Sequence, residues 1–108
     1  MSTELMAYTQ TLLQAYLDLP DTPSRCSSFD RTVARKLFQQ HIPLSSAKAA
    51  LALASMRRCY RSSNALPLPP IRSLAYFLPV IEELRAAPPD YWDYCWNRFL
   101  SLQKALPL

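Results

Sequence analysis

The chain of 108 residues contains no glycine, and this absence limits what it can be more than any other feature. Phosphate-binding loops of the Walker, Rossmann and kinase types need glycine because their backbone approaches the ligand too closely to leave room for a Cβ atom. The composition therefore argues against all three kinds of nucleotide site. Ten prolines, rather than glycines, mark the breaks between the ordered segments.

Between these breaks, hydrophobic residues recur at the three- and four-residue spacing of amphipathic helices. Helices are expected over residues 3–18, from 27 or 28 to about 40, over 46–61, over 73–87 and over 89–105. The fourth contains Pro79, which either kinks it or starts a second helical segment. No alternation typical of a β-strand is long enough to propose a sheet. The sequence thus predicts an all-α fold, a single compact domain of about five helices over residues 1–108.

Local signals define the boundary between the second and third helices. Ser27 and Asp30 have the spacing of a capping box, in which each side chain accepts a hydrogen bond from the other residue's backbone amide. His41 stands where many helices end in glycine, and Pro43 cannot continue a helix. Because histidine enters the left-handed region more readily than most residues, we expect His41 to end the second helix.

The third helix is apolar on nearly every side. One broad arc contains Ala47, Ala50 and Leu51, and the opposite stripe consists of short side chains such as Ser45 and Ser55. A helix of this kind is usually central and largely buried. Short side chains would also let it lie flush in a DNA groove. Both interpretations follow from the sequence.

Charge is strongly segregated along the chain. Residues 25–72 carry nine basic side chains and one acid, Asp30, whereas the rest of the chain carries three basic side chains and seven acids. Surfaces that bring many positive charges together attract polyanions, above all the phosphates of nucleic acids. The distribution therefore predicts a nucleic-acid-binding protein with a basic central segment.

A resemblance adds to this interpretation. The stretch VARKLFQQHIPLSSAKAALALA, residues 33–54, resembles the helix-turn-helix units of small DNA-binding domains, in which an alanine and a leucine of the first helix pack under the second. The first helix here is nearly a turn longer than usual. Over residues 16–85 the wider pattern, with LPDTPSR, HIPL and PIRSLAYFLPVIEEL, is similar to small bacterial proteins associated with mobile elements and with replication or transposition.

The resemblance implies a helix-turn-helix-like core over about residues 28–61, followed by a linker over 62–72 and C-terminal helices over 73–105. Its recognition helix would begin with Ser45, Ser46, Lys48 and Ala49, at the end that reads base edges. The candidates for phosphate contacts are Arg25, Arg31, Arg35, Lys36, Arg57, Arg58 and Arg61. No side chain suited to bidentate base contacts lies on the recognition stripe, so we expect modest sequence specificity.

The last helix carries a wide aromatic face. Its residues Tyr91, Trp92, Trp96 and Phe99 either complete the core or form an interface with a protein partner or a second copy of the chain. This face supports an alternative function, a helical adapter subunit of a larger nucleoprotein complex. Such a subunit would use the aromatic helix for protein contacts and the basic face for RNA or an RNA–DNA heteroduplex.

The sequence offers no candidate catalytic residue and no metal site. His41 is the single histidine, and Cys26, Cys59 and Cys95 are widely separated without a Cys-x-x-Cys pair. No apolar run is long enough to span a membrane, and the first residues lack the features of a signal peptide. We therefore expect a cytoplasmic, non-enzymatic accessory or regulatory factor of a mobile-element or replication system. It would bind nucleic acid, with DNA favoured over RNA, and would need no cofactor or small-molecule substrate.

Overall fold

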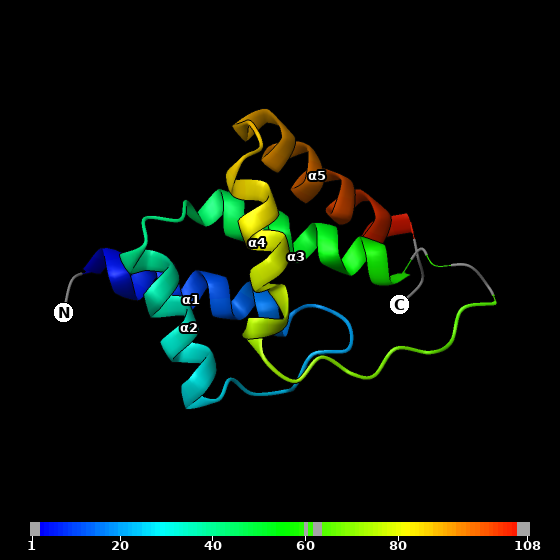
Figure 1. Ribbon diagram of the computed structural model, residues 1–108, viewed down its shortest axis with the longest axis horizontal. Coiled ribbons are helices and arrows are strands. Elements are labelled where there is room, and N and C mark those ends of the chain that lie inside the picture. The colour runs from blue at the N-terminus through cyan, green and yellow to red at the C-terminus, as the bar shows by residue number, and fades with distance from the viewer. Residues whose placement is uncertain (1–2, 60, 62–63, 106–108) are drawn as a thin grey trace.

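Six helical segments make up the computed structural model, which describes residues 3–59, 61 and 64–105 (Figure 1). They are α1 (Thr3–Leu17), α2 (Ser28–Gln39), α3 (Leu44–Cys59), η1 (Leu74–Phe77), α4 (Leu78–Arg85) and α5 (Pro89–Ala105), of which η1 is a short 3-10 helix. No strand occurs among the described residues. The predicted all-α single domain of about five helices is confirmed.

The centre of the fold is α3, on which α1, α4 and α5 all pack (Figure 1). Half of its sixteen residues are buried, so the prediction of a central, largely buried helix is confirmed. The stripe of short side chains opposite the apolar arc is buried only in part, since Ser55 is buried and Ser45 is exposed. Short side chains allow the surrounding helices to approach α3 closely.

Large side chains from the other helices fill the space around α3. The most buried of them are Leu12, Tyr16, Leu74, Phe77, Ile81 and Leu84. The rings of Tyr16 and Phe77 meet edge to face with their centroids 6.0 Å apart. Each such side chain contributes about 1.5–3 kcal/mol when it is fully withdrawn from water, and together they hold α1 and the η1–α4 segment against the central helix.

The start of α2 is held by the predicted capping box. Ser27 Oγ accepts from the Asp30 amide at 3.1 Å, and Asp30 Oδ2 accepts from the Ser27 amide at 2.9 Å. The second carboxylate oxygen of Asp30 accepts from the amide of Leu74, at the start of η1, at 2.9 Å. This carboxylate is therefore fully buried yet hydrogen-bonded at both oxygens, and it ties α2 to a segment 44 residues away.

The turn between α2 and α3 follows the sequence signals closely. His41 adopts a left-handed conformation with φ of 60°, as expected for the residue that ends α2. The third helix begins at Leu44, two residues before the expected start at Ser46, because the carbonyl of Pro43 already accepts from the amide of Ala47 at 3.0 Å. The helices of a helix-turn-helix pack on each other, whereas α2 packs mainly on α1 and η1 rather than on α3.

Pro79 marks the start of a second segment rather than a kink. It lies in the first turn of α4, where a missing amide hydrogen costs nothing. Ser73 stands at the N-terminal cap position of η1, but its side chain makes no capping hydrogen bond. The buried carboxylate of Asp30 takes this role by accepting from the first amide of η1.

Candidate nucleic-acid interface

The basic residues of the central segment divide between two places in the fold. Arg25, Arg31, Arg35 and Lys36 lie on α2 and the loop before it, and we call this set the α2 basic face. Arg57, Arg58 and Arg61 lie at the C-terminal end of α3 and just beyond it. Figure 1 shows α2 and the end of α3 well apart along the longest axis of the molecule. These cations of the basic central segment therefore do not form one continuous surface.

All four side chains of the α2 basic face are exposed. On α2, the basic residues occupy the side opposite the buried Val33 and Leu37. Asp30 is the one acid of this segment, and its carboxylate is hidden beneath the surface. Within the described part of the chain, none of the four cations forms an ion pair. The face therefore presents four positive charges with no carboxylate paired to them.

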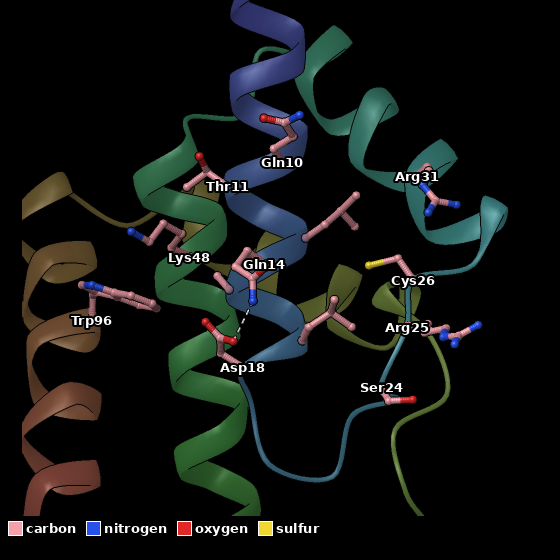
Figure 2. Close-up of a pocket in the computed structure, with 13 residues that line it drawn as sticks. Gln10, Thr11, Gln14, Asp18, Ser24, Arg25, Cys26, Arg31, Lys48 and Trp96 are labelled. Atoms are coloured by element: carbon pink, nitrogen blue, oxygen red, sulfur yellow. Dashed lines mark hydrogen bonds between the residues drawn. The ribbon is translucent and has the colours of Figure 1, made fainter.

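Arg25 and Arg31 also form one rim of an open groove that crosses α1 (Figure 2). The groove has a volume of about 950 Å³, and Gln10, Thr11 and Gln14 line it along the exposed side of α1. Figure 2 shows the two arginines pointing to the same side, away from α1. Asp18 also lines the groove and accepts from the Gln14 amide at 2.8 Å, so Gln10 and Thr11 are the lining side chains of α1 better suited to hydrogen bonding with a polyanion.

The opposite rim of this groove is formed by Lys48 of α3 and Trp96 of α5 (Figure 2). The Lys48 ammonium lies 4.3 Å from the centroid of the Trp96 ring, which is the geometry of a cation–π contact. The ammonium has no ion-pair partner among the described residues. Lys48 thus places a cation on this rim of the groove. The sequence had predicted a different role for it, at the base-reading end of a recognition helix.

The arginines at the end of α3 are engaged within the protein. Arg57 forms a bidentate ion pair with Glu83 of α4, at 3.0 and 2.8 Å. The hydrogen bond to Glu83 raises the pKa of Arg57, and the same contact lowers the pKa of Glu83. Arg61 donates to the carbonyl of Leu66 at 2.7 Å. Both side chains therefore already make contacts within the protein, unlike those of the α2 basic face, which form no ion pair among the described residues.

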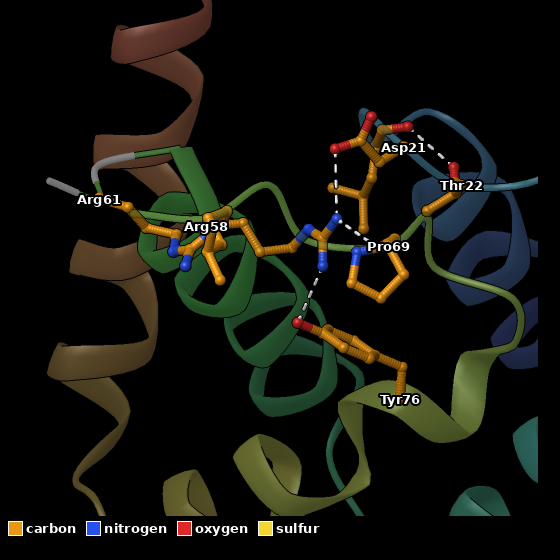
Figure 3. Close-up of polar contacts among 8 residues, drawn as sticks. Asp21, Thr22, Arg58, Arg61, Pro69 and Tyr76 are labelled. Carbon is orange, nitrogen blue, oxygen red and sulfur yellow. Dashed lines mark hydrogen bonds and ion pairs between the residues drawn. The ribbon is translucent and has the colours of Figure 1, made fainter. Parts of the chain in front are cut away.

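Arg58 is the most deeply engaged of them, since only 9% of its side chain is exposed. It donates to the Tyr76 hydroxyl at 3.2 Å, to Asp21 Oδ2 at 3.3 Å and to the carbonyl of Pro69 at 3.0 Å (Figure 3). Its guanidinium also lies 5.4 Å from the centroid of the Tyr76 ring. Arg58 therefore joins the loop after α1, the proline-rich connection and η1, and its place is structural.

The leading end of α3 is not a reading surface. Ser46 and Ala49 are completely buried, so neither can contact a base edge, and the role expected for them is wrong. Ser45 is exposed, and Lys48 is half-buried against Trp96. The short side chains that would suit a DNA groove are used for helix packing instead.

The aromatic face of α5 is divided between core and surface. Phe99 is buried, and Trp92 donates from Nε1 to the carbonyl of Leu84 at 2.7 Å, so both stabilise the fold. Tyr91 remains exposed, and its ring stacks on that of Tyr94 with centroids 6.2 Å apart. The sequence reasoning did not select Tyr94, although its spacing of three residues from Tyr91 places both on one helix face.

Other chemistry is sparse in the described part of the chain. Burial raises the pKa of the thiols of Cys26 and Cys95, which disfavours the reactive thiolate. No three His, Cys, Asp or Glu side chains of the described residues come together as a metal site. The helices of this part are all too short or too polar to cross a bilayer.

Comparison with known proteins adds no indication of function. No protein-family model, curated protein or solved structure matches the chain. The functional argument therefore depends on the charges and contacts of the surface.

Proposed function

We propose that the protein binds nucleic acid, with duplex DNA as the preferred ligand, through the α2 basic face. The observation that carries this proposal is the group of four exposed cations without an acidic partner in the described structure. Arginine and lysine in such a group release the counterions condensed on DNA when they contact its phosphates, and this release is the main source of sequence-independent affinity.

The binding mode differs from that of a helix-turn-helix. Because Ser46 and Ala49 at the leading end of α3 are buried, these residues cannot contact base edges in the major groove. Arg31 and Arg35 are one turn apart on the exposed side of α2, about 6 Å along the helix axis. Contacts from this face therefore go to the phosphate backbone and carry little sequence information. An accessory role in a mobile-element or replication system requires only such sequence-independent binding to DNA.

The acidic residues support one orientation on the ligand. Glu82, Glu83, Asp90 and Asp93 lie on α4 and at the start of α5. In Figure 1 the α4–α5 turn is at the top of the view and α2 is at the lower left. Because Glu83 is paired with Arg57 and Glu82 with Arg85, a polyanion is attracted more strongly by the unpaired cations of the α2 basic face than by the α4–α5 region, so the charge distribution directs the α2 basic face toward DNA.

The test is a salt series with a fluorescently labelled DNA duplex, read by anisotropy. If each cation of the α2 basic face contacts one phosphate, the slope of log K against log salt is about −3.6, which is four contacts at about −0.9 each. Doubling the salt concentration then weakens binding about 12-fold. The double variant Arg31→Ala/Arg35→Ala removes two contacts, and we expect its slope to fall to about −1.8.

The matched control is the double variant Arg98→Ala/Lys104→Ala. It removes the same two charges from exposed positions on α5, away from the α2 basic face, so its slope should stay near that of the unmodified protein. The proposal fails if the duplex does not bind at low salt. It also fails if the slope of log K against log salt falls by the same amount in both double variants. Equal losses would mean that net charge, rather than this face, attracts the DNA.

A second candidate function is an adapter within a nucleoprotein complex, favoured by the exposed pair Tyr91 and Tyr94. These side chains are 39% and 60% exposed, and aromatic side chains of this kind are enriched in protein interfaces. The same anisotropy series with duplex RNA and an RNA–DNA heteroduplex distinguishes the two functions. Tighter binding of RNA or heteroduplex than of DNA would favour the adapter.

A further inference from the structure

The connection between α3 and η1 contains the sequence LPLPPIR, residues 66–72, which we call the proline strap. It has no regular secondary structure and runs along the outside of the helices, coloured yellow-green in Figure 1. The nucleic-acid interface does not use this segment. Its exposed prolines and leucines therefore need a separate explanation.

Local sterics restrict the backbone of the strap to an extended form. Pro67, Pro69 and Pro70 each fix φ near −65°, about the value of a polyproline II helix. The α region is disfavoured for a residue that precedes proline, and this applies to Leu66, Leu68 and Pro69. Residues 66 to 69 therefore favour the range that includes polyproline II, and Pro70 has its φ fixed near that range.

A polyproline II helix has three residues per turn, so residues three apart lie on one ridge. Ile71 is 3% exposed, and its amide donates to the carbonyl of Asp21 at 2.9 Å. Leu68, three residues earlier, lies beside Ala54 and Arg58 of α3 and is 41% exposed, against 81% for Leu66. The ridge with Leu68 and Ile71 therefore faces the protein.

The two other ridges face outward. One contains Leu66, Pro69 and Arg72, the other contains Pro67 and Pro70, and all five residues are exposed. They follow the spacing Pro-x-x-Pro-x-Arg, in which two of the three x positions, Leu68 and Ile71, hold the side chains on the ridge that faces the protein. The strap thus offers two hydrophobic-proline pairs and, at its end, a cation without an ion-pair partner in the described structure.

We propose that the proline strap is a docking segment for a partner domain of the SH3 type, which has an aromatic-lined groove flanked by acidic side chains. Grooves of this kind bind Pro-x-x-Pro segments in the polyproline II conformation. Leu66–Pro67 and Pro69–Pro70 fill the two aromatic pockets. Arg72 pairs with the acidic flank, which gives the complex its orientation.

Two arginines hold the strap in place for such docking. Arg58 donates to the carbonyl of Pro69 (Figure 3), and Arg61 donates to the carbonyl of Leu66. Both contacts are made to backbone oxygens, while the side chains of the outward ridges remain exposed. A segment already held in its bound conformation loses less entropy on association than a free peptide does. The folded chain therefore binds at least as tightly as a peptide of residues 64–73.

The experiment is a titration of the ¹⁵N-labelled full chain with an isolated SH3 domain that binds Pro-x-x-Pro-x-Arg peptides. We expect chemical-shift changes confined to the strap and its immediate neighbours. Pro70→Ala and Arg72→Glu should each weaken binding about 10-fold or more, since residues that fill pockets or pair with charges account for most interface affinity. The matched controls Pro88→Ala and Arg98→Glu alter exposed residues outside the strap and should leave the affinity unchanged.

Three results would overturn the proposal. The first is absence of binding by the full chain. If the peptide of residues 64–73 binds while the full chain does not, the strap is inaccessible in the fold, and the proposal is overturned in that case too. The second is shift changes centred elsewhere. The third is unchanged affinity for the Arg72→Glu variant, whose fold is checked by circular dichroism and which alters charge without changing a proline.

Discussion

The arginines at the end of α3 offer a direct test of how burial decides the energetic role of a charge. Arg57 and Arg58 are neighbours in sequence, yet the Arg57 side chain is 52% exposed and that of Arg58 is 9% exposed. Methionine at either position keeps most of the aliphatic length and removes the charge and the donors. The two substitutions differ only in the surroundings of the guanidinium.

The expected magnitudes follow from the contacts. Arg57 and Glu83 form a surface ion pair, and such pairs contribute about 0–1 kcal/mol to stability. Arg58 makes three hydrogen bonds and a cation–π contact, and a single hydrogen bond to a charged group contributes about 1.5–3 kcal/mol. Asp21 is 65% exposed, so water solvates its carboxylate when Arg58 is removed. We therefore expect Arg58→Met to lower the free energy of unfolding by about 2–3 kcal/mol, the contribution of about one such hydrogen bond.

Urea denaturation followed by circular dichroism measures both effects. With an m-value of about 1–3 kcal/mol per molar urea, a loss of about 2–3 kcal/mol lowers the midpoint by roughly 1–2 M. The effect of Arg57→Met should be smaller and should fade at about 1 M salt, where the Debye length is about 3 Å. Equal losses for the two variants, or a loss below about 0.5 kcal/mol for Arg58→Met, would refute the reasoning. Arg58 would then be free enough to return to the list of phosphate contacts.

Two further predictions concern the buried polar groups of the core. Asp30→Ala leaves the amides of Ser27 and Leu74 without their acceptor and should cost about 2–4 kcal/mol by chemical denaturation, whereas the exposed control Asp93→Ala should cost under about 0.5 kcal/mol. Burial, with a smaller contribution from the Asp30 charge, raises the pKa of Tyr16 from 10.0 to about 12, so the fold favours the neutral phenol. The stability that this shift contributes is fully present below pH 10 and is lost as the pH rises toward 12, by up to about 3 kcal/mol. Tyr16→Phe should therefore lose less stability between pH 9 and 11 than Tyr94→Phe, and equal losses would contradict the assignment.

Much of the secondary structure was predictable because its causes are local. The capping box of Ser27 and Asp30, the left-handed His41 and the position of Pro79 at the start of α4 all depend on residues within one turn of each other. The burial of α3 also followed from its own composition, since a helix without a polar side has no stable orientation at a surface.

The candidate site was predictable only in part. The segregation of charge along the sequence shows where the cations are, but it does not show which of them lack an ion-pair partner in the fold. Arg57 meets an acid 26 residues away, and Arg58 meets one 37 residues away. Nothing in the local sequence distinguishes them from Arg31 and Arg35, which meet none among the described residues.

The sequence by itself determined where the helices lie, to within a turn at their ends, made α3 a candidate for the centre of the fold and favoured an extended proline strap, since each depends on sterics and periodicity within a few residues. The tertiary structure alone decided which side chains face water. It buried Ser46 and Asp30, engaged Arg58 and left the α2 basic face open. The physical reason is that burial and ion pairing depend on distances between segments far apart in the chain, and these distances exist only once the helices have packed.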